Sequence, residues 1–125
     1  MQAAQHNTNV EVIQYLYNTF KDTIDINKQD KYGKTVLMLA AWRNTNIEVI
    51  QYLCETFKDT IDINQQDDYG NTAFMLAASN TNVEVIQFIY TTFKSTIDIN
   101  KQDEDSRTTF MLAVQDNTNV EVIQY

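Results

Sequence analysis

Residues 44–51 read Asn-Thr-Asn-Ile-Glu-Val-Ile-Gln, and this motif decides the fold because it occurs four times. The other copies begin at Asn7, Asn80 and Asn117 with valine in place of isoleucine, so the intervals are 37, 36 and 37 residues (7 to 44, 44 to 80, 80 to 117). Self-similarity at one period of this length is the signature of a repeat protein. Other segments recur in the same register: Phe-Lys at Phe20, Phe57 and Phe93, Ile-Asp-Ile-Asn from Ile24, Ile61 and Ile97, and Gln-Asp at Gln29, Gln66 and Gln102.

Each repeat is predicted to contain two short helices. Residues 35–42 are apolar, and Thr35 is placed to cap the first turn of a helix, as are Thr72 and Thr108 in the next repeats. The Asn-Thr-Asn segment then ends this helix and caps the second one. An extended stretch from Ile61 leads into a turn at residues 67–70. In the second helices, apolar residues at helical spacing form a stripe that we expect to be buried: Ile47, Ile50, Leu53, Cys54 and Phe57, then Val83, Ile86, Ile89, Tyr90 and Phe93.

Helices this short are marginal alone, because helix nucleation is costly. They gain burial by stacking on a neighbouring unit, so the sequence predicts an all-α solenoid of helix-turn-helix units. We expect one domain over residues 1–125, from a longer array. Its parts are a partial repeat at 1–28, full repeats at about 29–65 and 66–101, and a partial repeat at 102–125.

The repeat resembles that of the ankyrin family over essentially the whole chain. Residues 30–41, Asp-Lys-Tyr-Gly-Lys-Thr-Val-Leu-Met-Leu-Ala-Ala, are similar to the family's Asp-x-x-Gly-x-Thr-Pro-Leu-His-x-Ala-Ala run. Residues 46–53 resemble its second-helix motif, and residues 62–64 resemble the Asp-Val-Asn that closes a repeat. The resemblance implies extended turn or hairpin loops between repeats. It also implies a protein-interaction module that binds through a concave surface of turn tips and first helices.

Two departures from the family pattern carry structural expectations. Methionine replaces the family's histidine, and we expect the side-chain hydrogen bond between turn and helix to be lost. Ser106 stands where Gly33 and Gly70 stand in the other repeats. A positive φ at Ser106 would cost about 1 kcal/mol, so we expect the third turn to be the softest. The three methionines, which recur with the repeat as packing residues, are Met38, Met75 and Met111.

Trp42 is the first candidate for partner binding. The equivalent positions hold polar residues, so a lone tryptophan there is expected to face solvent and to anchor a partner. The alternative is that Trp42 folds over the adjacent Asn-Thr-Asn loop. The equivalent residues are Gln5, Ser79 and Gln115.

The turn tips differ most between repeats, and the resemblance places them on the recognition surface. Tyr32 and Tyr69 are therefore contact candidates, although both rings could instead pack against their own turns. The candidate partner-binding residues are Trp42, Tyr32, Tyr69, Asp68, Lys31 and Arg43.

The net charge of −8 and pI near 4.4 indicate the class of partner. An acidic surface repels phosphate backbones and acidic membranes, so we expect neither nucleic acid nor a membrane as partner, but a protein with a basic patch. No apolar run reaches the length of a membrane span. One cysteine, Cys54, cannot form an internal disulfide, which fits a reducing, cytoplasmic location.

Enzymatic function is not expected, because the polar residues that recur do so with the repeat, whereas a catalytic site needs singular groups. His6 is the single histidine, and Cys54 lies on the apolar stripe, where a packing role is favoured over a reactive thiol. We expect no cofactor and no small-molecule substrate. The second functional candidate is a structural spacer that positions another domain.

The segment of Asp25, Asn27 and Asp30 faintly resembles a calcium loop, but it lacks the loop's glycine and bidentate glutamate. We interpret these residues as turn-formers and expect no metal site. Some ankyrin proteins are hydroxylated at an asparagine that would here be Asn27, Asn64 or Asn100. The leucine preferred eight residues upstream is threonine in all three repeats, which disfavours that modification.

Overall fold

The computed structural model describes residues 10–43 and 46–116, and these residues form helices joined by loops, with no strand among them. The motif copies that begin at Asn7 and Asn117, together with Gln5 and His6, lie outside the described residues, as do Asn44 and Thr45. The helices of the described part are α2 (Val10–Phe20), α3 (Val36–Arg43), α4 (Ile47–Phe57), α5 (Ala73–Ala78), α6 (Val83–Phe93) and α7 (Thr109–Asp116).

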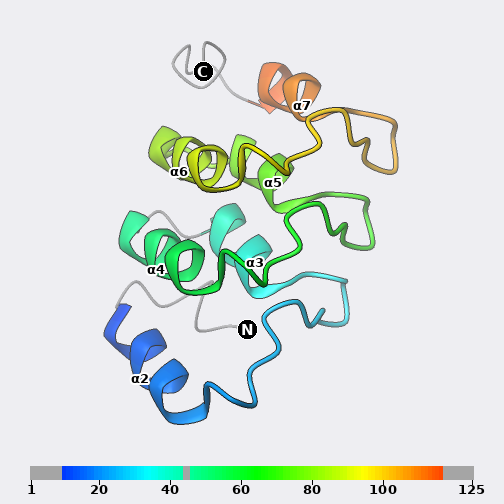
Figure 1. Ribbon diagram of the computed structural model, residues 1–125. Coiled ribbons are helices and arrows are strands. Elements are labelled where there is room, and N and C mark those ends of the chain that lie inside the picture. The colour runs from blue at the N-terminus through cyan, green and yellow to red at the C-terminus, as the bar shows by residue number, and fades with distance from the viewer. Residues whose placement is uncertain (1–9, 44–45, 117–125) are drawn as a thin grey trace.

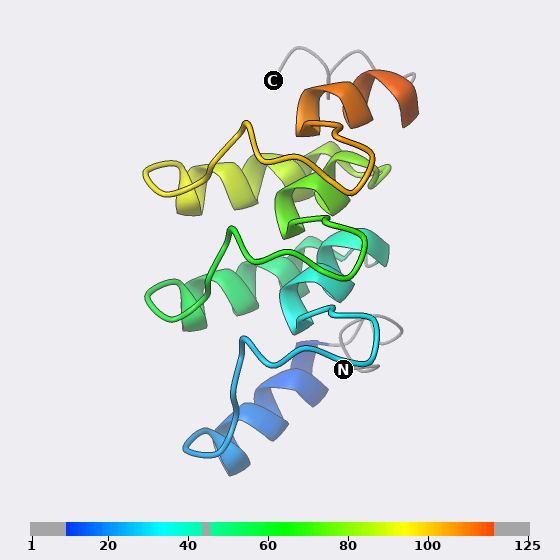
Figure 2. The same ribbon diagram turned by 90° about the vertical axis from the view of Figure 1, so that its right-hand side faces the viewer.

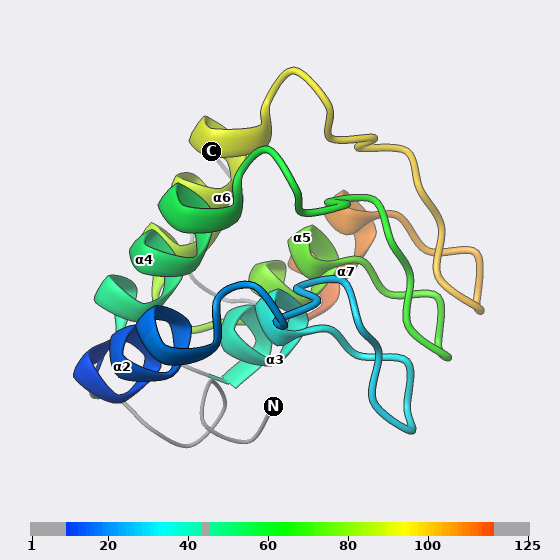
Figure 3. The same ribbon diagram turned by 60° about the horizontal axis from the view of Figure 1, so that its bottom comes forward.

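The helices form two rows that run along one axis (Figures 1 and 2). The first helices α3, α5 and α7 pack on one another in one row, and the second helices α2, α4 and α6 pack in the other. The loops that enter each first helix project on the same side of the stack (Figure 3). This arrangement confirms the predicted all-α solenoid.

Short polar side chains start the helices at the predicted residues. The Thr72 hydroxyl accepts a hydrogen bond from the Met75 backbone N–H at 3.2 Å, and Thr35 caps α3 in the same way through Met38 at 3.3 Å. The Asn46 side chain caps α4 by accepting from the Glu48 N–H at 2.9 Å. Each cap satisfies one of the N–H groups that the first helical turn leaves unpaired.

The methionines that replace the family's histidine keep a hydrogen bond between turn and helix, contrary to expectation. The sulfur of Met38 accepts a hydrogen bond from the Thr35 backbone N–H at 3.4 Å, and that of Met75 accepts from the Thr72 N–H at 3.5 Å. The expected loss of this bond is therefore wrong for these two repeats. A thioether sulfur, although a weak acceptor, occupies the place of the family's imidazole.

The core lies between the two rows of helices, and most of the predicted stripe is buried in it. Val49 and Val85, which the stripe did not include, are also fully buried, so the apolar face of the second helices is wider than predicted. The largest buried side chains are Leu37, Met38, Ile50, Leu53, Met75, Ile89, Val49, Val85 and Cys54.

Tyr90 was expected on the buried stripe, and this is wrong, because 42% of its surface is exposed. In α4 the equivalent Cys54 is flanked by α2 and by α6, whereas α6 has only α4 beside it among the described helices of its row. Phe110 in α7 is exposed for the same reason, while its counterparts Leu37 and Phe74 are covered by the next first helix. Burial thus depends on the neighbouring repeat, as in solenoids generally.

Side-chain amides join successive repeats. The Asn27 amide donates to the Thr60 carbonyl at 2.8 Å, and its oxygen accepts from the Asp62 N–H at 2.9 Å. Asn64 repeats this pair of bonds one unit later, with Thr96 and Asp98. Both functional atoms of each amide are therefore used to hold one repeat against the next.

Candidate functional site

Each turn tip is built around an aspartate. One Asp67 carboxylate oxygen accepts hydrogen bonds from the backbone N–H groups of Tyr69 and Asn71, both at 2.9 Å. Asp30 in the first tip and Asp103 in the third make the same pair of bonds. The side chain thus acts as a template that fixes the loop, which is the common role of aspartate in turns.

The residue two positions before each first-helix cap has a left-handed backbone. φ is +81° at Gly33 and Gly70 and +64° at Ser106, which confirms the positive φ considered for the serine. Gly33 is required for a second reason. A Cβ there would lie 2.7 Å from the backbone nitrogen of Asp68, closer than such contacts allow.

The tips are joined into one row by backbone hydrogen bonds. The N–H of Asp68 donates to the Tyr32 carbonyl at 3.0 Å, and the N–H of Glu104 donates to the Tyr69 carbonyl at 2.9 Å. Gln29 and Gln66 add side-chain bonds between the same loops. The three tips therefore form a continuous edge whose members keep fixed relative positions (Figure 3).

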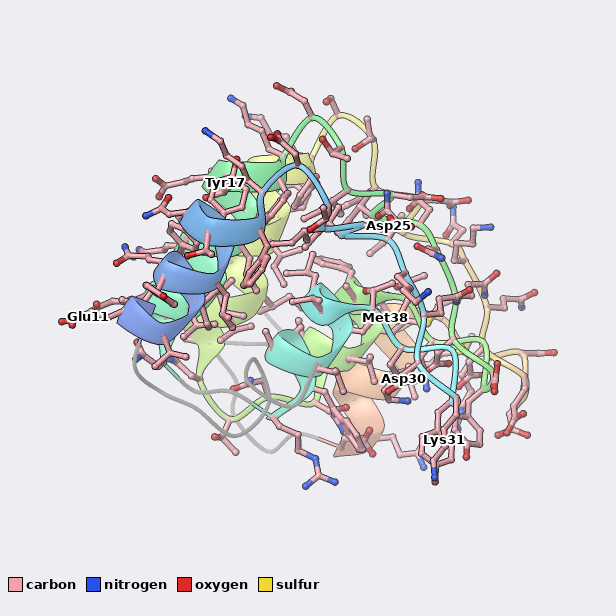
Figure 4. The ribbon with its side chains drawn as sticks, turned by 90° about the horizontal axis from the view of Figure 1, so that it is seen from below. Glu11, Tyr17, Asp25, Asp30, Lys31 and Met38 are labelled. Atoms are coloured by element: carbon pink, nitrogen blue, oxygen red, sulfur yellow. The ribbon has the colours of Figure 1, made fainter. Side chains whose placement is uncertain are left out.

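Lys31 lies at the outer end of the first tip, while Met38 lies among the helices (Figure 4). The Lys31 ammonium is 5.1 Å from the centre of the Tyr32 ring. Tyr32 and Tyr69 are 48% and 46% exposed. About half of the surface of each tyrosine residue is therefore exposed to solvent.

Lys34 is the residue at this surface that the sequence did not single out. Its ammonium lies 2.7 Å from an Asp67 carboxylate oxygen, and the two side chains are only 8% and 0% exposed. The same ammonium lies 5.0 Å from the Trp42 ring centre and 5.2 Å from that of Tyr69. One buried cation thus connects the first tip to the second and contacts two of the candidate rings. The sequence could have revealed Lys34 through a change in charge at one repeat position, which holds Lys34, Asn71 and Arg107 in successive repeats.

Trp42 is half-buried. Its side chain is therefore less exposed to solvent than the polar residues at the equivalent positions of the other repeats had suggested. It packs against the core, and the Arg43 guanidinium lies 4.0 Å from its ring centre. Two of the six candidates, Trp42 and Arg43, therefore contact each other beside the Lys34 cation. Packing over the Asn-Thr-Asn loop involves Asn44 and Thr45, which lie outside the described residues.

The third tip carries its own ion pair. The Arg107 guanidinium contacts Asp103 at 3.1 Å and Asp105 at 3.2 Å. Burial raises the pKa of the Asp103 carboxyl, but hydrogen bonds from the Arg107 and Asp105 backbones and the Arg107 charge outweigh it, so the pKa lies below its ordinary value. The Asp103 carboxyl is thus charged at neutral pH and fully engaged within its own tip.

The residues that were considered as a calcium loop make hydrogen bonds within their own turns. Asp25 accepts from the Asn27 N–H at 3.0 Å and Asp62 from the Asn64 N–H at 3.2 Å, which supports their interpretation as turn-formers. Over residues 10–43 and 46–116, no cluster of side chains has the composition of a metal site.

Cys54 is fully buried, and burial, with a smaller contribution from Glu55, raises the pKa of its thiol to about 12 despite a hydrogen bond with Thr92.

A groove of about 350 Å³ lies between α4 and α6, on the row of second helices. The sequence did not predict it. Its lining holds one carboxylate and no pair of nucleophile and base. The residues that line it are Ile47, Gln51, Glu84, Gln87, Phe88 and Thr91.

Comparisons with known proteins bear on this geometry. A family model described as ankyrin repeats (three copies) matches residues 1–103. A search of curated proteins finds no match for the chain. In the part of the chain that the structure covers, none of the helices has the length and apolar character needed to cross a bilayer.

Proposed function

Because the chain belongs to the ankyrin-repeat family, we propose that it is a protein-interaction module that binds its partner through the turn tips and the exposed side of the first helices. Ankyrin repeats generally bind other proteins and are typically not enzymes. The part of this proposal that goes beyond the family is the location of the binding surface on this chain.

One observation supports this location of the binding surface. Tyr32 and Tyr69 present half-exposed rings on consecutive tips that are hydrogen-bonded to each other. Tyrosine is favoured at binding surfaces because it supplies a large, rigid contact area at low cost in conformational entropy. The proposed contact residues are Tyr32, Tyr69, Trp42, Arg43, Lys31 and Asp68.

The charge of the chain supports a protein partner with a basic patch. The net charge of −8 attracts cationic surfaces and repels phosphate backbones and acidic membranes. We propose a cytoplasmic location, because the chain has one cysteine, which is buried and unpaired. Neither a cofactor nor a small-molecule substrate forms part of the proposal.

A pull-down with the complete 125-residue chain tests the surface. We expect a Tyr32→Ala, Tyr69→Ala double variant to lose the bound partner, and Trp42→Ala to weaken it. The matched control is Tyr15→Ala, because Tyr15 is 68% exposed on α2, in the other row of helices. A partner retained by the tip variant but lost with Tyr15→Ala would place the surface on the second helices instead. Melting curves identify variants that lose binding through unfolding.

A structural spacer is the second candidate, and the bonds between repeats favour it. Asn27 and Asn64 each clamp one repeat to the next, which stiffens the array. A spacer needs no partner at the tips. If no protein is captured in a tyrosine-dependent manner, this function is supported over the binding module.

A further inference from the structure

We propose that the row of tips selects one extended polypeptide segment of a partner by the order of its charges. An acidic residue would lie against the first tip, apolar residues against the two tyrosines, and lysine or arginine against the second and third tips. This inference rests on the proposed function and adds the chemistry of the segment that is bound.

The exposed charges of the tips are arranged in a fixed order. The first tip presents Lys31, the second Asp68 and the third Glu104, all exposed, and within residues 10–43 and 46–116 none of them forms an ion pair. The other two cations of the row are neutralised internally, Lys34 by Asp67 and Arg107 by the aspartates of its own tip. The exposed charge that forms no ion pair therefore changes from positive to negative along the row.

This order is preserved by the backbone. The carbonyl of Tyr32 accepts a hydrogen bond from the Asp68 N–H, and the carbonyl of Tyr69 accepts one from the Glu104 N–H, so the backbone of each acidic residue is bonded to the tyrosine of the preceding tip. The Lys34 ammonium lies 5.2 Å from the Tyr69 ring centre and restrains that ring. A segment that runs along the row thus meets a cation and a ring at the first tip, a carboxylate and a ring at the second, and a carboxylate at the third.

Electrostatics disfavours segments that carry charge of one sign only. A uniformly basic segment would place a cation against Lys31, and a uniformly acidic one would meet Asp68 and Glu104. Like charges brought together at an interface are unfavourable and suppress wrong partners. A nucleic acid would bring phosphates to the same two carboxylates. The segment that complements all three tips is bipolar, with an apolar centre.

The test uses a library of random peptides displayed on phage, selected against the complete chain. We expect the selected peptides to carry an acidic residue on one side of an apolar stretch and lysine or arginine on the other. For a synthetic copy of one such peptide, Lys31→Glu should weaken binding about fivefold, the upper range for an exposed ion pair. Replacing the peptide's acidic residue by lysine should restore binding to that variant.

The matched control is Lys94→Glu, which makes the same charge change at the exposed C-terminal end of α6 and should leave the affinity within about twofold. Uniformly basic peptides, or peptides that bind Lys31→Glu as well as the parent chain, would overturn the charge order and leave the proposed function standing. If no selected peptide depends on Tyr32 and Tyr69, both the charge order and the proposed binding surface fail.

Discussion

Single residues set the backbone of the tips. The glycine position has positive φ in all three, and at Gly33 and Gly70 a Cβ would also lie 2.7 Å from a backbone nitrogen of the next tip. Ser106 has the same φ sign and is exposed. The left-handed backbone of this exposed serine therefore stores strain.

Replacement of Ser106 by glycine should stabilise the protein. An L-residue in the left-handed region costs about 1–2 kcal/mol, which is partly offset because glycine gains entropy in the unfolded chain. We expect a net gain of about 0.5–1 kcal/mol and a melting temperature about 2–4 °C higher in calorimetry. Ser95→Gly is the control, because φ at Ser95 is not positive, and it should leave the melting temperature unchanged or lower it. A lower melting temperature for Ser106→Gly would contradict the assignment of strain.

Cys54 should react slowly with iodoacetamide in the folded protein. Burial raises the pKa of its thiol to about 12, so the thiolate, which is the reactive form, is scarce at pH 8 and increases only as the pH approaches 12. In denaturant the thiol pKa returns to about 8.5, and alkylation should become fast. Mass spectrometry of samples alkylated with and without denaturant measures both rates. Equal rates would show that the thiol is accessible in the native state.

At the scale of the structural elements, the row of tips contains one ion pair between two tips and another within a single tip, and the two pairs differ in burial. Lys34 and Asp67 join two repeats and are almost fully buried, whereas Arg107 and Asp103 lie in one tip and the arginine side chain is 36% exposed. Removing one partner of a buried pair leaves an uncompensated charge in a poorly solvated place. The two ion pairs therefore provide a direct comparison.

Lys34→Met should lower the free energy of unfolding by about 3 kcal/mol, because Asp67 loses its counter-charge while its carboxylate stays buried. Arg107→Met should cost only about 1 kcal/mol, because water reaches the exposed guanidinium and already screens that pair. Urea denaturation of both variants measures the difference. Equal losses, or a neutral Lys34→Met, would mean that the ion pair between repeats does not stabilise the stack.

The elements also show where sequence reasoning succeeds. The helix caps at Thr72 and Asn46 follow from chemistry within a few residues and were predicted correctly, and the positive φ at Ser106 had been considered for the same local reason. The pairing of Lys34 with Asp67 spans 33 residues and depends on how two repeats stack. The exposure of Tyr90 depends likewise on a neighbouring repeat. For the same reason the six candidate residues could be named from the turns, but their mutual contacts could not.

At the scale of the molecule, the array is a chain of repeats coupled to their nearest neighbours. Its stability is then a sum of repeat and interface contributions, and weakening one interface uncouples the parts on either side. Asn64 is the polar clamp between the second and third described repeats, with bonds of 2.8 Å to both Thr96 and Asp98. Trp42, the single tryptophan, lies in α3 and reports on the other side of that interface.

We expect Asn64→Ala to lower the stability of the third repeat by about 1–3 kcal/mol, since two hydrogen bonds between repeats are lost and a backbone N–H and carbonyl are left without these partners. In denaturant titrations, circular dichroism should then begin to change before Trp42 fluorescence, because helices α6 and α7 unfold before α3. The amide of Asp98 should lose hydrogen-exchange protection, while that of Asp62, which is bonded to Asn27, should keep it. Asn100→Ala is the matched control, because no described residue hydrogen-bonds the Asn100 side chain, and its two titration curves should coincide. Coincident curves for Asn64→Ala, with Asp98 still protected, would show that apolar packing between the helices couples the repeats without help from the amide clamp.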